Sequence, residues 1–259
     1  MGTILFNRVI FGPVKSRRLG NSLGINLLPN TSKLCNYNCI YCECGWTYHS
    51  HQPRKKFHTV LSVLTSLEEK LSAMKASDET PDTLTFAGNG EPTLHPNFSE
   101  IIAGVMELRD EFYPLAKIAV LSNGTMIQSD KVYEALCKVD KNMLKLDTAI
   151  EETYKILNSP PKEFSLQKLI ENLQRFKGNF IIQTLFLTGL VAGREINNTT
   201  PNEISAWMNL VAMLNPSEVH IYSLARETPS IDLHAVAPEK LKEIGDQLKE
   251  KKIKSFVFN

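Results

Sequence analysis

The stretch CNYNCIYC at residues 35–42 holds three of the five cysteines of this 259-residue chain: Cys35, Cys39 and Cys42. A buried structural cysteine behaves as a small apolar residue, and core packing gives no reason to gather three of them in one loop rich in Asn and Tyr. Thiolates, by contrast, are common ligands of metals. The spacing of the three cysteines therefore indicates a shared metal site.

Zinc is one alternative for this site, because thiolates suit it. Zinc knuckles and ribbons normally pair two halves, each with two Cys or His ligands, and the sequence offers no second half. An iron–sulfur cluster of cubane geometry has four irons, so three thiolates leave one iron without a protein ligand. A catalytic zinc keeps one position open in the same way. The three cysteines therefore favour a cluster with one iron free for chemistry.

Length, charge and cysteine usage limit the classes of protein to consider. A chain of 259 residues fits one large α/β domain, since barrels of this class run to roughly 250 residues. Lys and Arg number 29 against 28 Asp and Glu, and the net charge of +1 gives no general attraction to nucleic acid or membrane. We see no secretory signal and no apolar run of about 20 residues. With an odd number of cysteines, this favours a cytoplasmic protein without a membrane partner.

Segments with strand character alternate with helical stripes along the chain. We expect strands at residues 23–28, 83–86, 117–121, 143–146, 180–187 and 219–222, and a last apolar run at 255–258. We expect helices at residues 59–74, 97–110, 130–137, 166–176, from residue 200 onward and at 238–251. Asn97 is positioned to cap the second helix, and Cys137 is expected in the core. Such alternation predicts a parallel sheet.

The predicted fold is therefore α/β, a partial (βα)6 TIM-like barrel. We expect a single domain over residues 1–259, with its core at about 22–226, a lead-in at 1–21 and a C-terminal extension at 227–259. In such barrels the functional residues gather at the carboxyl ends of the strands. The cysteine loop follows the first of these strands, so the residues after the later strands are the candidates for the rest of the site.

Two of these strand ends carry small and polar residues. Gly88, Asn89, Gly90 and Glu91 follow the second strand, where small residues let the backbone approach a ligand and a carboxylate can receive an ammonium group. Ser122 and Asn123, before a glycine, follow the third. An ordinary tight turn explains the first stretch equally well, and the second stretch is by itself also a normal turn.

The remaining candidates lie at later strand ends and in the lead-in. Asp147 can accept from hydroxyl groups or cap a helix. A buried Gln183 needs a hydrogen-bond partner, which a ligand would supply if the side chain faces the barrel lumen. Arg226 can bind a carboxylate or phosphate. The substrate candidates are Tyr222, Arg226 and, from the basic turn of the lead-in, Arg17 and Arg18.

The spacing Cys-x3-Cys-x2-Cys, with Tyr41 just before the last cysteine, resembles the signature of the radical S-adenosylmethionine superfamily. The resemblance implies a 4Fe-4S cluster on Cys35, Cys39 and Cys42, whose open iron is chelated by the amino and carboxylate groups of S-adenosylmethionine. One electron from the cluster then cleaves this cofactor to methionine and a 5'-deoxyadenosyl radical, which abstracts a hydrogen from the substrate. Family members have open barrels of six units, in agreement with the predicted fold.

The resemblance also gives the strand ends their expected roles. Residues 88–91 resemble the Gly-Gly-Glu motif that contacts the methionine amino group, with Asn89 where glycine is common. Ser122 and Asn123 stand at the level that binds the ribose or the methionine carboxylate. Tyr41, Asp147 and Gln183 complete the expected cofactor site. The stretches at residues 11–29, 35–45 and 86–96 resemble a branch of small uncharacterised proteins grouped with iron–sulfur oxidoreductases related to wybutosine-synthesising enzymes.

The sequence defines the partners and the substrate less closely than it defines the cofactor site. Because the sequence shows no flavodoxin-like extension, we expect the electron to come from a separate donor such as flavodoxin or ferredoxin. RNA, a peptide or a small molecule remains open as substrate. The alternatives are a non-catalytic iron–sulfur or zinc-binding regulator, and an RNA-binding module that uses the basic residues at 15–18 and 54–56. His49 and His51 are expected to be solvated loop residues, and Cys44 is not assigned as a ligand.

Overall fold

The computed structural model describes residues 4–47 and 57–258. His49, His51 and the basic run at 54–56 lie outside the described residues. The chain divides into two compact units. The amino unit comprises Leu5–Cys35 and Thr47–Asn142, and the carboxyl unit comprises Met1–Ile4, Asn36–Trp46 and Met143–Asn259. The boundary falls inside the cysteine loop, so that Cys35 belongs to the amino unit and the other two cysteines of the loop to the carboxyl unit.

The sheet of the amino unit contains β1 (Ile10–Ser16), β2 (Gly20–Ile25), β3 (Thr83–Phe86) and β4 (Lys117–Ser122), in this order. β1 is antiparallel to β2, whereas β2, β3 and β4 are parallel to one another. Leu23 lies opposite Leu84, which lies opposite Ile118. Because the three parallel strands are in register, the loops that follow β3 and β4 leave from the same edge of the sheet.

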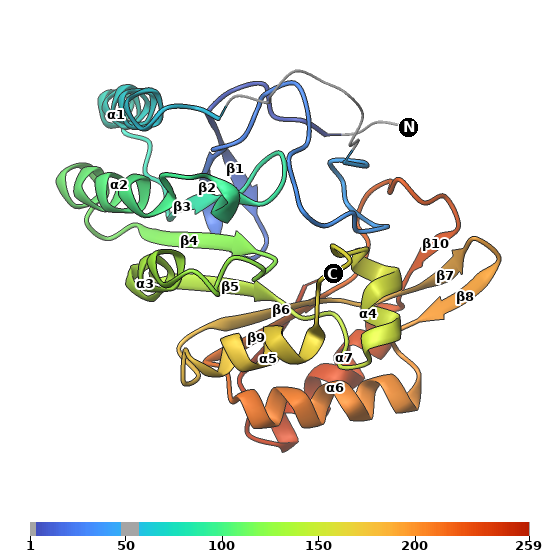
Figure 1. Ribbon diagram of the computed structural model, residues 1–259. Helices are drawn as coiled ribbons and strands as arrows, with labels where there is room; N and C mark the ends of the chain where they lie inside the picture. The colour runs from blue at the N-terminus through green and yellow to red at the C-terminus, as the bar shows by residue number, and fades with distance from the viewer. Residues whose placement is uncertain (1–3, 48–56, 259) are drawn as a thin grey trace. The chain divides into compact units, whose positions relative to one another are not determined.

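Helices α1 (Val60–Ala76), α2 (Phe98–Phe112) and α3 (Asp130–Lys138) accompany this sheet, with a short 3-10 helix η1 (Pro92–Leu94) after β3. α1 packs beside α2, and α2 beside α3 (Figure 1). α1 buries the expected apolar stripe, and Thr59 caps it by accepting from the amide of Ser62.

Two local predictions for these helices were wrong. Asn97 precedes α2 but does not cap its backbone, since its side chain donates to Glu100 instead. Cys137 is exposed rather than in the core, because α3 turns Val132, Ala135 and Leu136 inward. In both cases the helix is where the sequence predicted it, and the side chain points elsewhere.

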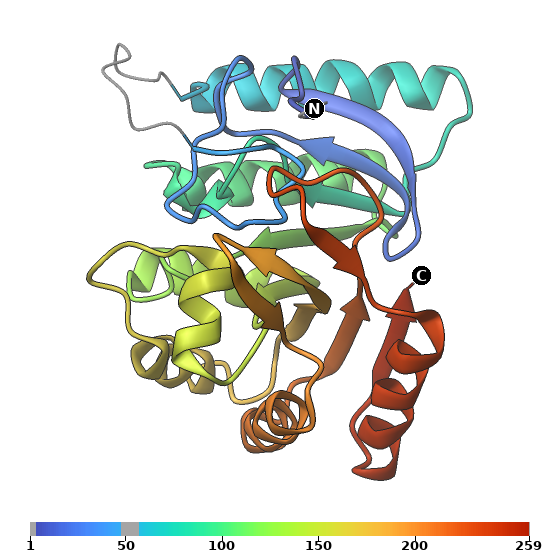
Figure 2. The same cartoon turned by 90° about the vertical axis from the view of Figure 1, so that its right-hand side faces the viewer.

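The main sheet of the carboxyl unit contains β5 (Lys141–Lys145), whose first two residues precede the boundary, β6 (Ile181–Leu185), β9 (Glu218–Tyr222) and β11 (Ser255–Phe258). These strands are parallel, with Met143 opposite Ile181 and Val219 opposite Ser255. β11 comes after helix α7 (Pro238–Glu250), which packs against it (Figure 2). The predicted apolar run at 255–258 is thus a strand of this sheet.

A small antiparallel sheet, which the sequence did not predict, contains β10 (Leu233–Ala235), β7 (Leu187–Val191) and β8 (Arg194–Asn197). It corrects the strand predicted at 180–187, since β6 ends at Leu185 and β7 begins a new strand. Asn198 fixes this break: its Oδ1 accepts from the amide of Leu187, and its Nδ2 donates to the carbonyl of Leu185. A local apolar pattern cannot show such a break.

The other helices of the carboxyl unit are α4 (Glu151–Asn158), α5 (Leu166–Gln174) and α6 (Pro201–Leu214). Thr200 caps α6 and Pro201 begins it, as predicted. α4 was not predicted. Among the described residues, the parallel strands β2, β3, β4, β5, β6 and β9 are each followed by at least one helix before the next of them. The predicted strand and helix alternation is therefore present. No helix in the described part of the chain is both long and apolar enough to cross a membrane.

Candidate functional site

The Gly88–Glu91 loop of the amino unit is paired with Leu34, the residue before Cys35. Leu34 forms a parallel bridge with Gly90. Its amide donates to the carbonyl of Asn89 at 2.8 Å, and its own carbonyl accepts from the amide of Glu91 at 3.1 Å. Gly90 has a φ of +135°, and a Cβ atom there would lie 1.9 Å from the Leu34 carbonyl oxygen. Glycine is therefore required at this position. Its partner in the bridge, Leu34, directly precedes Cys35.

The side chain of Asn89, fully buried, clamps the lead-in segment. Its Oδ1 accepts from the amide of Phe6 at 2.8 Å, and its Nδ2 donates to the carbonyls of Phe6 and Pro29 at 2.9 and 2.8 Å. Its backbone amide donates to Asn26. These bonds give a structural reason for asparagine where the Gly-Gly-Glu motif has glycine. They engage the Asn89 side chain with other residues of the protein rather than with a ligand.

Glu91 joins the ends of the two neighbouring strands. Its Oε1 accepts from the hydroxyl of Ser122 at 2.8 Å and from Thr93, and its Oε2 accepts from the amide of Asn123 at 2.7 Å. Burial raises the pKa of the Glu91 carboxyl above its ordinary value, while the hydrogen bonds from Asn123, Thr93 and Ser122 act in the opposite direction. The carboxylate therefore fixes the loop after β3 to the loop after β4.

Asn123 connects this arrangement to the first cysteine. Its Oδ1 accepts from the amide and the hydroxyl of Thr125, at 3.0 and 2.7 Å. This fixes the orientation of the carboxamide, and its Nδ2 lies 3.8 Å from the Sγ of Cys35. The amino unit thus brings together the first cysteine and the residues that the sequence predicted at two separate strand ends.

In the carboxyl unit the cysteine loop docks on the end of α4. The amide of Asn38 donates to the carbonyl of Asn158 at 3.0 Å, and the amide of Ile40 donates to the carbonyl of Leu157 at 3.0 Å. The last carbonyls of a helix have no partner within the helix, so the loop satisfies them. The hydroxyls of Tyr37 and Tyr154 lie 3.0 Å apart. The unpredicted helix α4 therefore supports the loop that carries two of the three cysteines.

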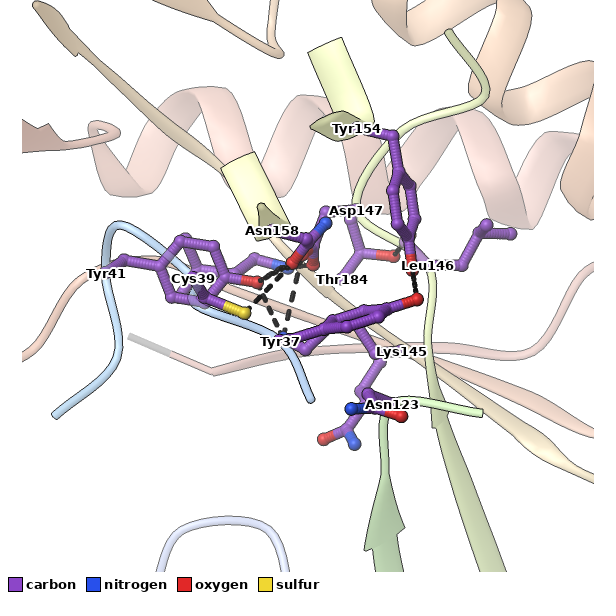
Figure 3. A network of polar contacts seen from close by, with 12 residues as sticks. Tyr37, Cys39, Tyr41, Asn123, Lys145, Leu146, Asp147, Tyr154, Asn158 and Thr184 are labelled. Atoms are coloured by element: carbon purple, nitrogen blue, oxygen red, sulfur yellow. Dashed lines mark hydrogen bonds and ion pairs between the residues drawn. The ribbon is translucent and has the colours of Figure 1, made fainter. Parts of the chain in front are cut away.

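A buried polar network surrounds Tyr41 (Figure 3). The Tyr41 hydroxyl donates to Asp147, while the ammonium of Lys145 donates to the Tyr41 oxygen at 2.6 Å and lies 3.6 Å from Asp147. The same ammonium is 4.7 Å from the centre of the Tyr41 ring. Asp147 also accepts from the amide of Leu185 at 2.9 Å. Each oxygen of this fully buried carboxylate thus has a partner in the protein.

The protonation states of this network follow from its surroundings. Burial, followed by the negative charge of Asp147, raises the pKa of the Tyr41 phenol well above its ordinary value. Burial opposes the charge on Lys145, but Asp147, with Tyr222 and the nearby cysteines, outweighs it and raises the pKa of this ammonium. The network therefore contains a neutral phenol and a charged ammonium. Sequence reasoning did not single out Lys145, although its place at the end of an expected strand was a usable signal.

The other predicted residues of the carboxyl unit have identified places. Gln183 is buried and its Nε2 donates to the carbonyl of Met143 at 3.1 Å, so its amide bonds to the sheet backbone. Tyr222 ends β9. Arg226 forms an exposed ion pair with Glu43 at 2.5 Å, and Glu43 directly follows Cys42 in the sequence.

Arg17 and Arg18 lie in the turn between β1 and β2. β2 starts just after this turn and runs parallel to β3, with Ser22 opposite Thr83 at the start of that strand. The turn is therefore at the amino ends of the parallel strands, whereas Glu91 follows a carboxyl end. Within the amino unit, the substrate candidates Arg17 and Arg18 therefore lie at the opposite end of the parallel strands from Glu91.

The described residues fit an iron–sulfur cluster through their donor chemistry. None of the five cysteines, all of which lie in the described residues, is joined in a disulfide, and Cys35 and Cys39 each have an asparagine carboxamide within hydrogen-bonding range. The carboxamide beside Cys39 is that of Asn158, whose buried amide nitrogen has no hydrogen-bond partner among the described residues. No three Cys, His, Asp or Glu side chains of the described chain are gathered as a preformed metal site. The fit therefore rests on thiols within one short loop and on the amides beside them.

Parallel strands that are followed by helices, with a loop of three cysteines after the first of these strands, define an α/β protein with candidate metal ligands at the carboxyl end of that strand. The family profile of the Radical SAM superfamily matches residues 30–208, which include the three cysteines. The chain belongs to the radical S-adenosylmethionine superfamily. The resemblance seen in the cysteine spacing is thereby confirmed.

Curated relatives cover most of this chain. A protein named GTPase Obg from Brachyspira hyodysenteriae is 28% identical over 254 residues, which are 96% of this chain and 34% of that protein. A UPF0026 protein from Methanocaldococcus jannaschii is 33% identical over 217 residues, which are 82% of this chain and 62% of that protein. The chain thus spans about a third of the first relative and less than two thirds of the second.

Solved structures share the fold at low sequence identity. A radical SAM methyltransferase from Sphaerobacter thermophilus superposes with a TM-score of 0.67 and 13% identity, covering 92% of this chain and 65% of that one. Archaeal TYW1 superposes with a TM-score of 0.53 and 14% identity, covering 88% of this chain and 71% of that one. The likeness shows the fold alone. It confirms the predicted α/β class and the partial TIM-like barrel.

Proposed function

We propose that this protein is a radical S-adenosylmethionine enzyme whose 4Fe-4S cluster is held by Cys35, Cys39 and Cys42. When bound, the cluster and S-adenosylmethionine supply a 5'-deoxyadenosyl radical, which takes a hydrogen atom from the substrate. The observation that carries the proposal is the family match over residues 30–208, which spans all three cysteines in the family's own spacing. The carboxamides beside Cys35 and Cys39 support it, because cluster sulfurs accept hydrogen bonds.

The Gly88–Glu91 loop is proposed to receive the methionine amino group through its backbone. The Glu91 side chain is engaged with Thr93, Ser122 and Asn123, so it is not free to act as the main acceptor. A backbone carbonyl has two lone pairs and can accept an ammonium in addition to an existing bond. Because the bridge between Leu34 and Gly90 holds this loop next to Cys35, its carbonyls are well placed relative to that ligand.

Tyr41, Lys145 and Asp147 are proposed to make a rigid, dry support for the loop with Cys39 and Cys42. Their side chains form one network, and Asp147 is fully buried. Exclusion of water and stray hydrogen donors is what a radical reaction requires of the protein. The substrate is proposed to be RNA or a small molecule, with Tyr222 and Arg226 as candidate contacts. The electron is proposed to come from a separate donor such as flavodoxin or ferredoxin.

Anaerobic reconstitution with iron and sulfide, followed by dithionite and S-adenosylmethionine, tests the proposal. We expect a brown protein that releases methionine and 5'-deoxyadenosine. The variants Cys35→Ala, Cys39→Ala and Cys42→Ala should each lose cluster and product. Cys137→Ala is the matched control, because this cysteine is exposed on α3, and it should retain both. A wild-type protein without a cluster, or with a cluster but no cleavage product, would exclude the proposal.

A non-catalytic metal-binding regulator is the second candidate, since three thiols also suit zinc. Elemental analysis of anaerobically purified protein separates the two. Zinc alone, with no cleavage of S-adenosylmethionine after reconstitution, would favour the regulator. Iron and sulfide in near-equal amounts, together with cleavage of S-adenosylmethionine, would favour the enzyme, whereas the same cluster without cleavage would favour an iron–sulfur regulator.

A further inference from the structure

The carboxamide of Asn158 faces both the sulfur of Cys39 and the hydroxyl of Tyr41 (Figure 3). Its oxygen position is 3.3 Å from the Sγ of Cys39 and 3.1 Å from the hydroxyl oxygen of Tyr41. Asn158 is fully buried at the end of α4, and its backbone carbonyl accepts from Asn38 of the cysteine loop. The side chain is therefore fixed against the loop from two directions. What it does there depends on whether its oxygen or its nitrogen faces the sulfur.

The hydrogen atoms available at Tyr41 decide this orientation. A phenol carries one hydrogen, and here it is donated to the carboxylate of Asp147. The Tyr41 oxygen already accepts from Lys145. With that hydrogen used, an Asn158 oxygen facing the Tyr41 oxygen would place two acceptors in contact. Rotating the carboxamide by half a turn exchanges its oxygen and nitrogen. The nitrogen then donates a hydrogen bond to the Tyr41 oxygen, and the orientation of an asparagine side chain follows from the hydrogen bonds around it.

The sulfur of Cys39 gives a second reason for the same orientation. A cysteine that ligates iron is a thiolate, which carries no hydrogen and can only accept. An Asn158 oxygen facing it would be repelled, while the amide group would be attracted. In the unrotated orientation the Asn158 nitrogen has no hydrogen-bond partner among the described residues, and leaving a buried donor without a partner is unfavourable. The rotated orientation gives that donor two acceptors, Tyr41 and Cys39.

Asn123 of the amino unit shows the same arrangement with its orientation already fixed. Both donors of Thr125 hold its oxygen, so its nitrogen faces the Sγ of Cys35 at 3.8 Å. Asn123 is also almost completely buried. Each of these two cysteines therefore has one buried asparagine carboxamide as a neighbour.

We infer that Asn158 is a positioning residue whose amide group donates a hydrogen bond to the sulfur of Cys39 when that cysteine ligates the cluster, as Asn123 does to Cys35. The inference rests on the proposed function, because it assumes that Cys39 is a cluster ligand. The hydrogen bond stabilises the reduced cluster more than the oxidised one, since the added electron increases the negative charge on the sulfurs. Hydrogen bonds to the sulfurs are one of the factors that set the reduction potential of such clusters. Asn158 therefore raises the potential at which the cluster accepts its electron.

The test is the midpoint potential of the reconstituted cluster, measured by anaerobic titration with dithionite and electron paramagnetic resonance. Asn158→Leu removes the donor at similar volume, and Asn158→Asp keeps the shape but places a carboxylate beside the sulfur. We expect a more negative midpoint in Asn158→Leu and a larger shift of the same sign in Asn158→Asp. Asn142→Leu is the matched control. Asn142 is also buried, has no side-chain partner among the described residues, and points to the opposite face of β5 from Lys145.

The outcomes separate the inference from the proposed function. A wild-type protein that takes up no cluster contradicts the proposed function. A wild-type cluster with midpoints unchanged in both Asn158 variants overturns the inference and leaves the proposed function intact. An equal shift in Asn142→Leu also overturns the inference, because the effect would then be general to buried asparagines. If Asn158→Leu does not fold, the shape-preserving Asn158→Asp decides by the same criterion.

Discussion

Replacing Asp147 by asparagine is expected to destabilise the protein strongly, because this carboxylate balances a buried ammonium. Asp147 is fully buried and accepts from Tyr41 and from the amide of Leu185, and it is the partner of Lys145 at 3.6 Å. An asparagine has one acceptor oxygen. It can therefore serve Tyr41 or Leu185 but not both, and it leaves Lys145 without a counterion.

The size of the effect follows from the environment of Lys145. Breaking a buried ion pair by removing one partner costs about 3–5 kcal/mol. The side chain of Lys145 is 15% exposed and keeps its contact with Tyr41, so the ammonium is partly relieved by water. We therefore expect the lower end, about 3 kcal/mol, which corresponds to a fall of about 6–12 °C in the melting temperature of a chain of this size.

The assay is urea unfolding of the cluster-free protein at pH 7 under reducing conditions, followed by circular dichroism. Lys145→Met and the double variant complete a thermodynamic cycle. The double variant should cost less than the sum of the two single variants, because it leaves no isolated charge. Glu151→Gln is the matched control. Its pair with Lys155 is exposed and is worth about 0.3–0.5 kcal/mol.

Two results would refute the reasoning. A cost of less than about 1 kcal/mol for Asp147→Asn would mean that Lys145 has another way to balance its charge. Additive costs within about 0.5 kcal/mol in the double variant would mean that the two groups do not interact.

The remaining predictions concern the amino unit. Gly90→Ala should lower the free energy of unfolding in urea by about 1–3 kcal/mol, because the added Cβ would overlap the Leu34 carbonyl. It should also lower cluster uptake. Unchanged uptake would contradict a role for the bridge between Leu34 and Gly90 in holding the cluster site. Burial raises the pKa of Asp140, but hydrogen bonds from neighbouring groups outweigh it, so the pKa is lowered in the folded protein. The ionised carboxylate therefore stabilises the fold at any pH above its ordinary pKa. This stabilisation is lost as the pH falls through the lowered pKa of the folded state. Asp140→Asn should therefore cost about 1–2 kcal/mol at pH 7 and progressively less in acid, and a pH-independent cost would refute this. Arg17→Ala and Arg18→Ala should leave cluster content and S-adenosylmethionine cleavage at wild-type levels. β2 spans about 17 Å at roughly 3.3 Å per residue, and it separates the turn with these arginines from the loops at the carboxyl ends of the parallel strands. A loss of cleavage product would argue against that placement.

The sequence by itself determined the features that depend on neighbours along the chain. Cysteine spacing is a local property, and it was sufficient to identify the superfamily that the family match confirms. The alternation of strands and helices is also local, because apolar residues repeat at the period of each element. It predicted the parallel strands and the cap of α6 at Thr200.

Tertiary structure alone decided the partners of the polar side chains. Asn158 lies 119 positions from Cys39, and Asn89 lies 83 positions from Phe6, so no local pattern connects either pair. Helix α4 has no side-chain cap, and it depends on the cysteine loop to satisfy its last carbonyls. The three cysteines could be predicted as ligands because the spacing of metal ligands is a property of the sequence. The asparagines beside Cys35 and Cys39 were not, because a hydrogen bond across the fold depends on the geometry of the folded backbone rather than on sequence distance.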